Sequence, residues 1–102
     1  MIVVIDDAKE CRWADIIVRN ADAGLLVLGA LQGNIEELYI DYDLGFNSSM
    51  NGLQILQNAI ANEIELPNII CIVSLNPIGR KAIENFLLNN GYRQTGGKFK
   101  RR

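Results

Sequence analysis

The apolar residues of this chain fall into short runs that are separated by polar segments. The unbroken runs are "IVVI" (2–5), "ELYID" (37–41) and "NIICIVS" (68–74). The first and the last of these runs are rich in β-branched residues, which is the pattern of strands buried on both faces, and "ELYID" is predicted to be a further strand. The segment "DIIVR" (15–19) is a weaker run, which fits either a strand or the opening of a helix.

Three other segments have the spacing and the end signals of helices. They cover residues 20–33, 52–64 and 76–91. Asn20 and Asn76 stand where an N-cap is expected, and Pro77 fits the first helical position. Gly33 and Gly91 are suitable stops for the first and third of these helices.

The middle helix is predicted to be amphipathic. Its expected apolar face consists of Leu53, Leu56, Ile60 and Ile64. Pro67 is expected to end this helix, and "GFNSSMN" (45–51) before it has the composition of a loop.

Strands that alternate with helices predict one α/β domain over residues 1–102, with a parallel sheet covered on both faces. The chain has no linker, repeat or low-complexity segment. The segment "KFKRR" (98–102) is predicted to be a basic tail, either a last edge strand or a frayed end.

Composition narrows the chemistry that this domain can perform. The 102 residues carry a net charge of −2, so no overall field attracts nucleic acid or an acidic membrane. The chain has no histidine and only two cysteines, which excludes Cys/His zinc sites and Ser-His-Asp triads. No apolar run approaches the roughly 20 residues of a membrane helix. No secretory signal is recognisable, so we expect a cytoplasmic protein.

Acidic and polar side chains follow three of the predicted strands. Asp6 and Asp7 come after "IVVI", Asp41 comes after "ELYI", and Ser74 comes after "NIICIV". Ligands of open α/β sheets bind at the carboxyl ends of the strands, so these side chains are expected to converge if the strands are neighbours. Clustered carboxylates are suitable ligands for Mg²⁺. Taken singly, each aspartate could instead serve only to begin a loop.

The segment after the last run adds features of a phosphate site. The Ser74 hydroxyl and the helix start at Asn76 could hold phosphate oxygens, with Arg80 and Lys81 adding positive charge. Capping alone also accounts for Asn76, and an Asx turn before Gly45 accounts for Asp43.

Together these residues resemble the receiver-domain superfamily, which has an acidic pair after the first strand, an acceptor aspartate after the third, and Ser or Thr after the fourth. A closer resemblance covers nearly the whole chain and is to the cyclic-phosphate processing receiver domain, associated with RNA-end processing. The segments that carry it are "IDD" (5–7), "IDYDLG" (40–45), "NGLQIL" (51–56) and "VSLNPIGR" (73–80). The last two are the more specific.

The resemblance implies a fold, an ion and an activity. The fold is a small doubly wound parallel sheet of four to five strands, flavodoxin- or receiver-like, with the first helix reduced to a loop and "DIIVR" as a strand. The activity is metal-dependent hydrolysis of a cyclic phosphate, such as a 2′,3′-cyclic RNA end. The implied ligands of Mg²⁺ or Mn²⁺ are Asp6, Asp7 and Asp41.

The resemblance also implies roles for the remaining polar residues. Asp43 would be a further ligand or a base, and Asp41 could alternatively attack phosphorus to form an aspartyl phosphate. The implied phosphate-binding residues are Ser74, Asn76 and Arg80.

Two departures keep a second function open. Family members often carry histidine at the places of Tyr42 and Val73, and the receiver lysine has only Lys98 as a candidate counterpart. The alternative is a non-catalytic receiver-like binding or switch module. The expected partner is a phosphate-containing small molecule or RNA end, with a protein partner also considered; the oligomeric state is left open.

Overall fold

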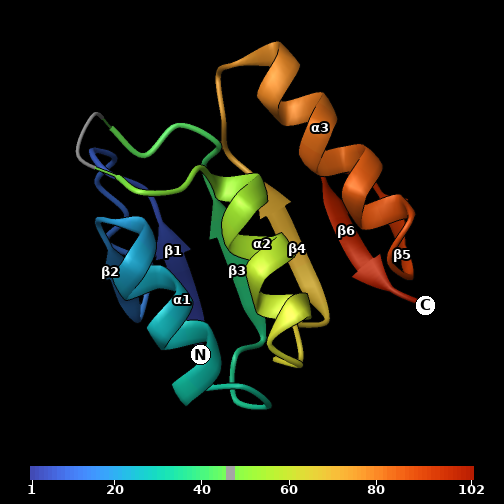
Figure 1. Ribbon diagram of the computed structural model, residues 1–102, viewed down its shortest axis with the longest axis horizontal. Coiled ribbons are helices and arrows are strands. Elements are labelled where there is room, and N and C mark those ends of the chain that lie inside the picture. Colours follow the sequence, from blue (N-terminus) through green and yellow to red (C-terminus); the bar gives the residue numbers. More distant parts are fainter. Residues whose placement is uncertain (46–47) are drawn as a thin grey trace.

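A computed structural model describes residues 1–45 and 48–102 of the chain. In these residues the structure has six strands and three helices (Figure 1). The strands are β1 (Ile2–Ile5), β2 (Ile16–Val18), β3 (Glu37–Ile40), β4 (Ile69–Ile72), β5 (Tyr92–Thr95) and β6 (Lys98–Arg101). The helices are α1 (Ala21–Ala30), α2 (Gly52–Ala61) and α3 (Pro77–Leu88).

All six strands form one sheet in the order β2-β1-β3-β4-β6-β5. The first four strands of this order are parallel, whereas β6 runs antiparallel to both of its neighbours. Residues 6–15 connect β1 to β2 without a helix. The predicted receiver-like α/β fold is therefore confirmed, including the first helix reduced to a loop and the strand at 15–19.

All three helices lie against the same face of the sheet (Figure 1). Their buried side chains form one cluster with alternate residues of the strands, such as Val3, Leu38 and Ile70, which stand side by side in register. Helical cover on both faces, which the alternation predicted, is not found in the described residues. The physical reason is that a right-handed crossover from β1 back to its neighbour β2 is the connection that would place a helix on the other face, and residues 6–15 contain no helix.

The carboxyl-terminal part differs most from the prediction. "KFKRR" contributes β6, which is an internal strand between β4 and β5 and neither a frayed end nor an edge. The edge strand is β5, which the sequence did not predict, so the sheet has six strands instead of four to five. The hairpin is held because Tyr92 and Phe99 bury their rings in the core.

Helix α2 also needs two corrections. It ends at Ala61, before Pro67, because Asn62 closes the last turn and Glu63 adopts a φ of 60° that no helix continues. Of its predicted apolar face, Leu56 is buried and Leu53 and Ile64 pack against the core, but Ile60 is 40% exposed; Ile55 and Ala59 are buried in addition. The predicted N-caps are confirmed, since Asn20 caps α1 and Asn76 caps α3.

Three smaller findings complete the fold. Cys11 and Cys71 are both buried and free, so they form no disulfide with each other. In the predicted loop 45–51, Gly45 and residues 48–51 contain no helix or strand, and residues 46–47 lie outside the described residues. Among the helices of the described ranges, none is long and apolar enough to cross a membrane.

A candidate metal and phosphate site

Three carboxylates meet at the carboxyl edge of the sheet. Asp6 and Asp7 follow β1, and Asp41 follows the adjacent strand β3. One carboxylate oxygen of each lies within 4.8 Å of the others. The sheet order brings them together as the sequence predicted, because neighbouring parallel strands end at the same edge.

Asp6 is fixed in place by the loop that follows it. It is 4% exposed, and its Oδ1 accepts hydrogen bonds of 3.1 Å from the backbone N–H groups of Ala8 and Lys9. Arg19 closes the same loop from outside, since its Nη1 donates to the carbonyl oxygens of Asp6 and Lys9. Arg19 is thus a positioning residue that the sequence did not single out.

Asp41 is the residue of this cluster whose carboxyl group has a raised pKa. Burial raises the pKa of its carboxyl group, and the neighbouring charge of Asp6 raises it further. Hydrogen bonds from the Ser74 side chain and from the backbone of Asp43 and Tyr42 act in the opposite direction. Because repulsion and burial outweigh these bonds, a cation placed among the carboxylates would be favoured.

The polar residues after β4 form a second layer around this cluster. Ser74 is buried, and its Oγ accepts a hydrogen bond of 3.1 Å from the backbone N–H of Asn76. The Asn76 side-chain oxygen caps α3 by accepting from the N–H groups of Ile78 and Gly79. Its Nδ2 donates to Asp43 Oδ2 over 3.3 Å. Asp43 therefore sits beside Asn76 and outside the three-carboxylate cluster.

Arg80 and Lys98 have partners of their own. Arg80 Nη1 donates to the carbonyl oxygen of Ile72 over 2.7 Å, and its Nε lies 3.6 Å from Glu84. Lys98 Nζ lies 2.9 Å from Glu37, the first residue of β3, at the end of that strand opposite to Asp41. Lys98 therefore does not occupy the place of the receiver lysine.

Two glycines allow the backbone to close around the site. A Cβ at Gly52 would lie 2.1 Å from the carbonyl oxygen of Asp41, and a Cβ at Gly79 would lie 2.3 Å from Cγ of Tyr42. The Tyr42 hydroxyl accepts a hydrogen bond of 3.1 Å from Asn51 Nδ2. Tyr42 thus bridges the starts of α2 and α3, which gives this side chain a structural task.

A hollow of about 380 Å³ opens over the carboxylates. Besides the three aspartates it is lined by Ala8, Lys9, Val73 and Leu75. The sequence reasoning missed Lys9 and Leu75. Lys9 carries no recognisable signal because the receiver lysine follows the last strand, and Leu75, which is 99% exposed, is an apolar residue within a polar segment.

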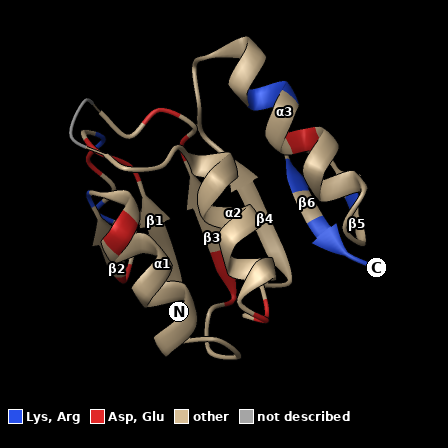
Figure 2. Cartoon of the chain, viewed as in Figure 1, with Lys and Arg blue, Asp and Glu red and all other residues tan. Residues whose placement is uncertain are grey.

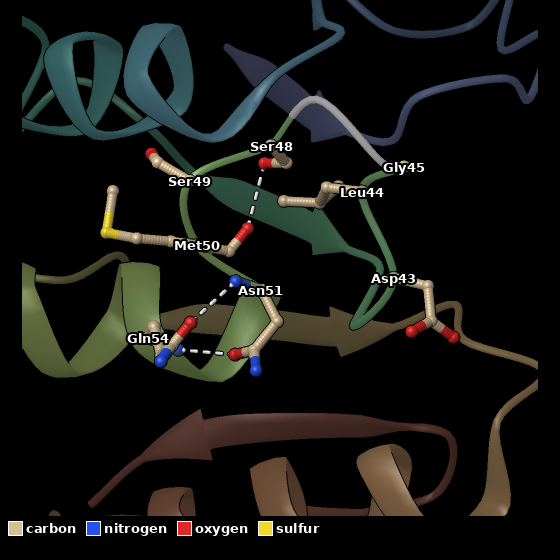
Figure 3. Close-up of a pocket in the computed structure, with 8 residues that line it drawn as sticks. All are labelled: Asp43, Leu44, Gly45, Ser48, Ser49, Met50, Asn51 and Gln54. Atoms are coloured by element: carbon tan, nitrogen blue, oxygen red, sulfur yellow. Dashed lines mark hydrogen bonds between the residues drawn. The ribbon is translucent and has the colours of Figure 1, made fainter.

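A second hollow of about 470 Å³ is lined in part by Gly45, where an added Cβ would lie 3.1 Å from Asp7 of the first hollow (Figure 3). Figure 3 shows the capping box of α2 on one side, in which Asn51 and Gln54 bond each other reciprocally, and Asp43 on the other. Asp43 belongs to this second hollow, whereas the three clustered carboxylates belong to the first.

Comparison with known proteins identifies the family to which this arrangement belongs. A family model described as "Cyclic-phosphate processing Receiver domain" matches residues 1–89. The chain belongs to the cyclic-phosphate processing receiver domain family. No curated protein and no solved structure matches it significantly. The match includes every candidate site residue and stops just after α3, so the β5–β6 hairpin lies beyond it.

Proposed function

We propose that this receiver domain opens cyclic phosphates by hydrolysis at a divalent cation, and that its substrate is a 2′,3′-cyclic phosphate such as that of an RNA end. The observation that carries the proposal is the cluster of Asp6, Asp7 and Asp41 with ligand atoms within 4.8 Å of one another. The family match supports the kind of substrate.

The donor set fits Mg²⁺ or Mn²⁺. Three carboxylates offer the hard oxygen ligands that these ions prefer, and the open side of the cluster leaves room for water and phosphate. The raised pKa of Asp41 supports the same assignment, because it reflects negative charge that a cation would balance. When bound, the ion would supply positive charge to the phosphate oxygens.

The residues around the cluster have distinct roles in this proposal. Ser74 and Asn76 hold phosphate oxygens, and Asp43, beside Asn76, takes the proton of the attacking water. Water adds to phosphorus, the bond from phosphorus to one ribose oxygen breaks, this oxygen takes up the proton held by Asp43, and a phosphate monoester results. Arg80 orders the end of β4 through its bond to Ile72 and adds positive charge near that edge.

Lys9 is proposed to complete the phosphate site. It lines the same hollow as the three carboxylates, and its backbone is fixed by the bond to Asp6. An ammonium group there would stabilise the charge of a bound phosphate, a task for which Lys98 is badly placed.

A non-catalytic binding or switch module is the second candidate function. It is favoured by one observation, that Tyr42 is engaged with Asn51 and Gly79 instead of acting as a proton shuttle. In this version the same carboxylates bind the cation, and a phosphate group or a protein partner is bound without turnover.

The test is a titration with Mn²⁺ and Mg²⁺ by calorimetry, followed by ³¹P NMR of 2′,3′-cyclic AMP in the presence of the ion. Wild type is compared with Asp41→Asn, and Lys9→Met tests the phosphate site. Glu63→Gln is a matched control, because it removes an exposed carboxylate from the segment that follows α2.

Saturable ion binding that Asp41→Asn abolishes, together with conversion of the cyclic ester to a monoester, is the expected result. Lys9→Met should leave ion binding intact and weaken the hydrolysis. Ion binding without conversion would instead establish the binding or switch module. If Asp41→Asn and Glu63→Gln bind the ion as wild type does, the metal site is wrong.

A further inference from the structure

The face of the sheet that lacks helices carries its own set of side chains. Strand residues alternate between faces, so the neighbours of the helix-side residues point to this open face. In register across the middle of the sheet they are Val4, Tyr39 and Cys71. Val4 and Cys71 do not belong to the helix-side core and are nevertheless buried, so the middle of this face is covered by other parts of the chain although no helix of the described residues lies on it.

An aromatic pair stands on this face. Trp13, in the loop between β1 and β2, meets the ring of Tyr39 edge-on, with 4.6 Å between the ring centroids. Trp13 remains 53% exposed, although burying an indole is strongly favourable. The Tyr39 hydroxyl donates to Glu37 Oε1 over 3.0 Å, which fixes the tyrosine ring as a platform.

Basic side chains lie on the same face, on the strands two and three places from β3, the strand of Tyr39, in the sheet order. Lys98 and Lys100 of β6 and Arg93 of β5 alternate with the core residues Phe99 and Tyr92, so they point to the open side. Figure 2 shows Lys and Arg on both strands of this hairpin, while Asp and Glu colour the loops after β1 and β3. The chain as a whole has a net charge of −2, but the β5–β6 hairpin is strongly basic.

Two of these charges are unbalanced. Arg93 and Lys100 are direct cross-strand partners, an arrangement of like charges that destabilises a sheet. Lys98 is paired with Glu37, but neither Arg93 nor Lys100 forms a salt bridge within residues 1–45 and 48–102. A hollow of about 400 Å³ lies beside Lys100, lined also by Ile69 and Arg102. Its charge suits a phosphate group.

Rigid aromatic rings beside a basic strip are the combination that single-stranded nucleic acids recognise. Bases stack on aromatic faces, and Lys and Arg follow the backbone. Since neighbouring strands lie about 4.8 Å apart, Lys98 is roughly 10 Å and Arg93 roughly 14 Å from Tyr39 across the sheet. A few linked nucleotides span this distance.

We propose that the open face, formed by Trp13, Tyr39, Arg93, Lys98 and Lys100, binds single-stranded RNA, with a base stacked on Trp13 and phosphates over Arg93 and Lys100. The choice of RNA over DNA rests on the proposed function, because only a ribose 2′-hydroxyl can form a 2′,3′-cyclic phosphate. The face would then hold the strand whose end reaches the carboxylates.

The test uses fluorescence anisotropy with a labelled six-nucleotide RNA that ends in a 3′-hydroxyl, in EDTA. No cyclic phosphate and no ion are present, so the result is independent of whether the domain hydrolyses anything. Trp13 is the only tryptophan of the chain, so quenching of its emission reports stacking directly. The same DNA sequence and a duplex RNA are titrated in parallel.

We expect binding that weakens with salt and quenches Trp13. Trp13→Ala should weaken it at least about fivefold, as expected for the loss of one stacked base. Arg93→Ala with Lys100→Ala should reduce the slope of log affinity against log salt by about 1.4. The matched control is Leu26→Ala, which truncates an exposed apolar residue of α1 and should leave the affinity for RNA unchanged.

Three results would overturn the proposal. The first is no binding at low salt, and the second is binding that the face variants leave unchanged while they stay folded by circular dichroism. The third is DNA or duplex RNA binding as tightly as the single-stranded RNA. If sedimentation instead shows self-association that Trp13→Ala abolishes, the face is an interface between two copies of the chain.

Discussion

The ring of Tyr42 lies so close to the backbone of Gly79 that a Cβ on this glycine would come within 2.3 Å of Cγ and 2.4 Å of Cδ2. Gly79→Ala should therefore destabilise the domain by roughly 1–2 kcal/mol, although alanine favours a helix by about 1 kcal/mol. Urea denaturation of the two proteins measures the difference. A Gly79→Ala variant that is more stable than the wild type would contradict the close contact between Tyr42 and Gly79.

The same contact can be isolated with a double mutant. In a Tyr42→Ala background the ring is gone, so Gly79→Ala should there raise the free energy of unfolding by about 0.5–1 kcal/mol. Gly29→Ala in α1 is the matched control, because its Cβ would meet only the flexible end of Ile64 at 3.3 Å. It should be neutral or stabilising in the wild-type background.

Asp41 should make the ion-free domain sensitive to pH. Its pKa in the folded state is raised above the ordinary value of 3.8, chiefly by burial and then by Asp6. Stability from this group is therefore fully present below that value and is lost as pH rises through the folded pKa. Asparagine at this position does not ionise. In EDTA, the free energy of unfolding of Asp41→Asn relative to wild type should therefore increase as the pH rises from acid to neutral. Equal pH profiles would contradict the raised pKa.

Glu37 should have the opposite effect at the other end of β3. The hydrogen bond from Lys98 lowers the pKa of Glu37 below its ordinary value of 4.5. Stability from this group is present above that value and is lost as pH falls through the folded pKa. Lys98→Met should remove this part of the acid sensitivity, whereas Lys81→Met should retain it. Thermal unfolding followed from pH 3 to 6 separates the two.

Asn76 should combine a structural and a functional task that can be separated. Asn76→Ala removes the cap of α3 and should lower the free energy of unfolding by about 1 kcal/mol. Asn76→Ser keeps a capping oxygen and should stay close to wild type in stability, but it lacks the amide that donates to Asp43. A serine variant with wild-type phosphate binding would exclude Asn76 from the phosphate site.

The sequence predicted the elements whose signals are local. The β-branched run of β1 and the caps at Asn20 and Asn76 are such signals, and each is where it was expected. The acidic cluster could also be predicted, since it needs only strand ends and their adjacency. The roles of its members in binding and catalysis remain predictions.

Features that depend on tertiary packing could not be predicted in this way. β5 has one buried residue, Tyr92, followed by three exposed ones, so it has no alternation to recognise. The Gly96–Gly97 pair was the available signal, because such a pair between two short segments is typical of a tight hairpin. The spacing alone predicts Ile60 on the buried face of α2, but in the folded chain the residues of this helix that enter the core are Ile55, Leu56 and Ala59.

The position of β6 between β4 and β5 also determines the order in which the sheet can be assembled. β5 precedes β6 along the chain, yet within residues 1–45 and 48–102 β6 is the one strand that pairs with it. A hairpin closed by a tight turn forms within about 1–10 microseconds, far faster than distant strands find one another. We therefore expect the two strands to dock as one unit, which would bring the core residues Tyr92 and Phe99 into place together. During synthesis, β4 stays an unprotected edge until residues 98–101 have left the ribosome.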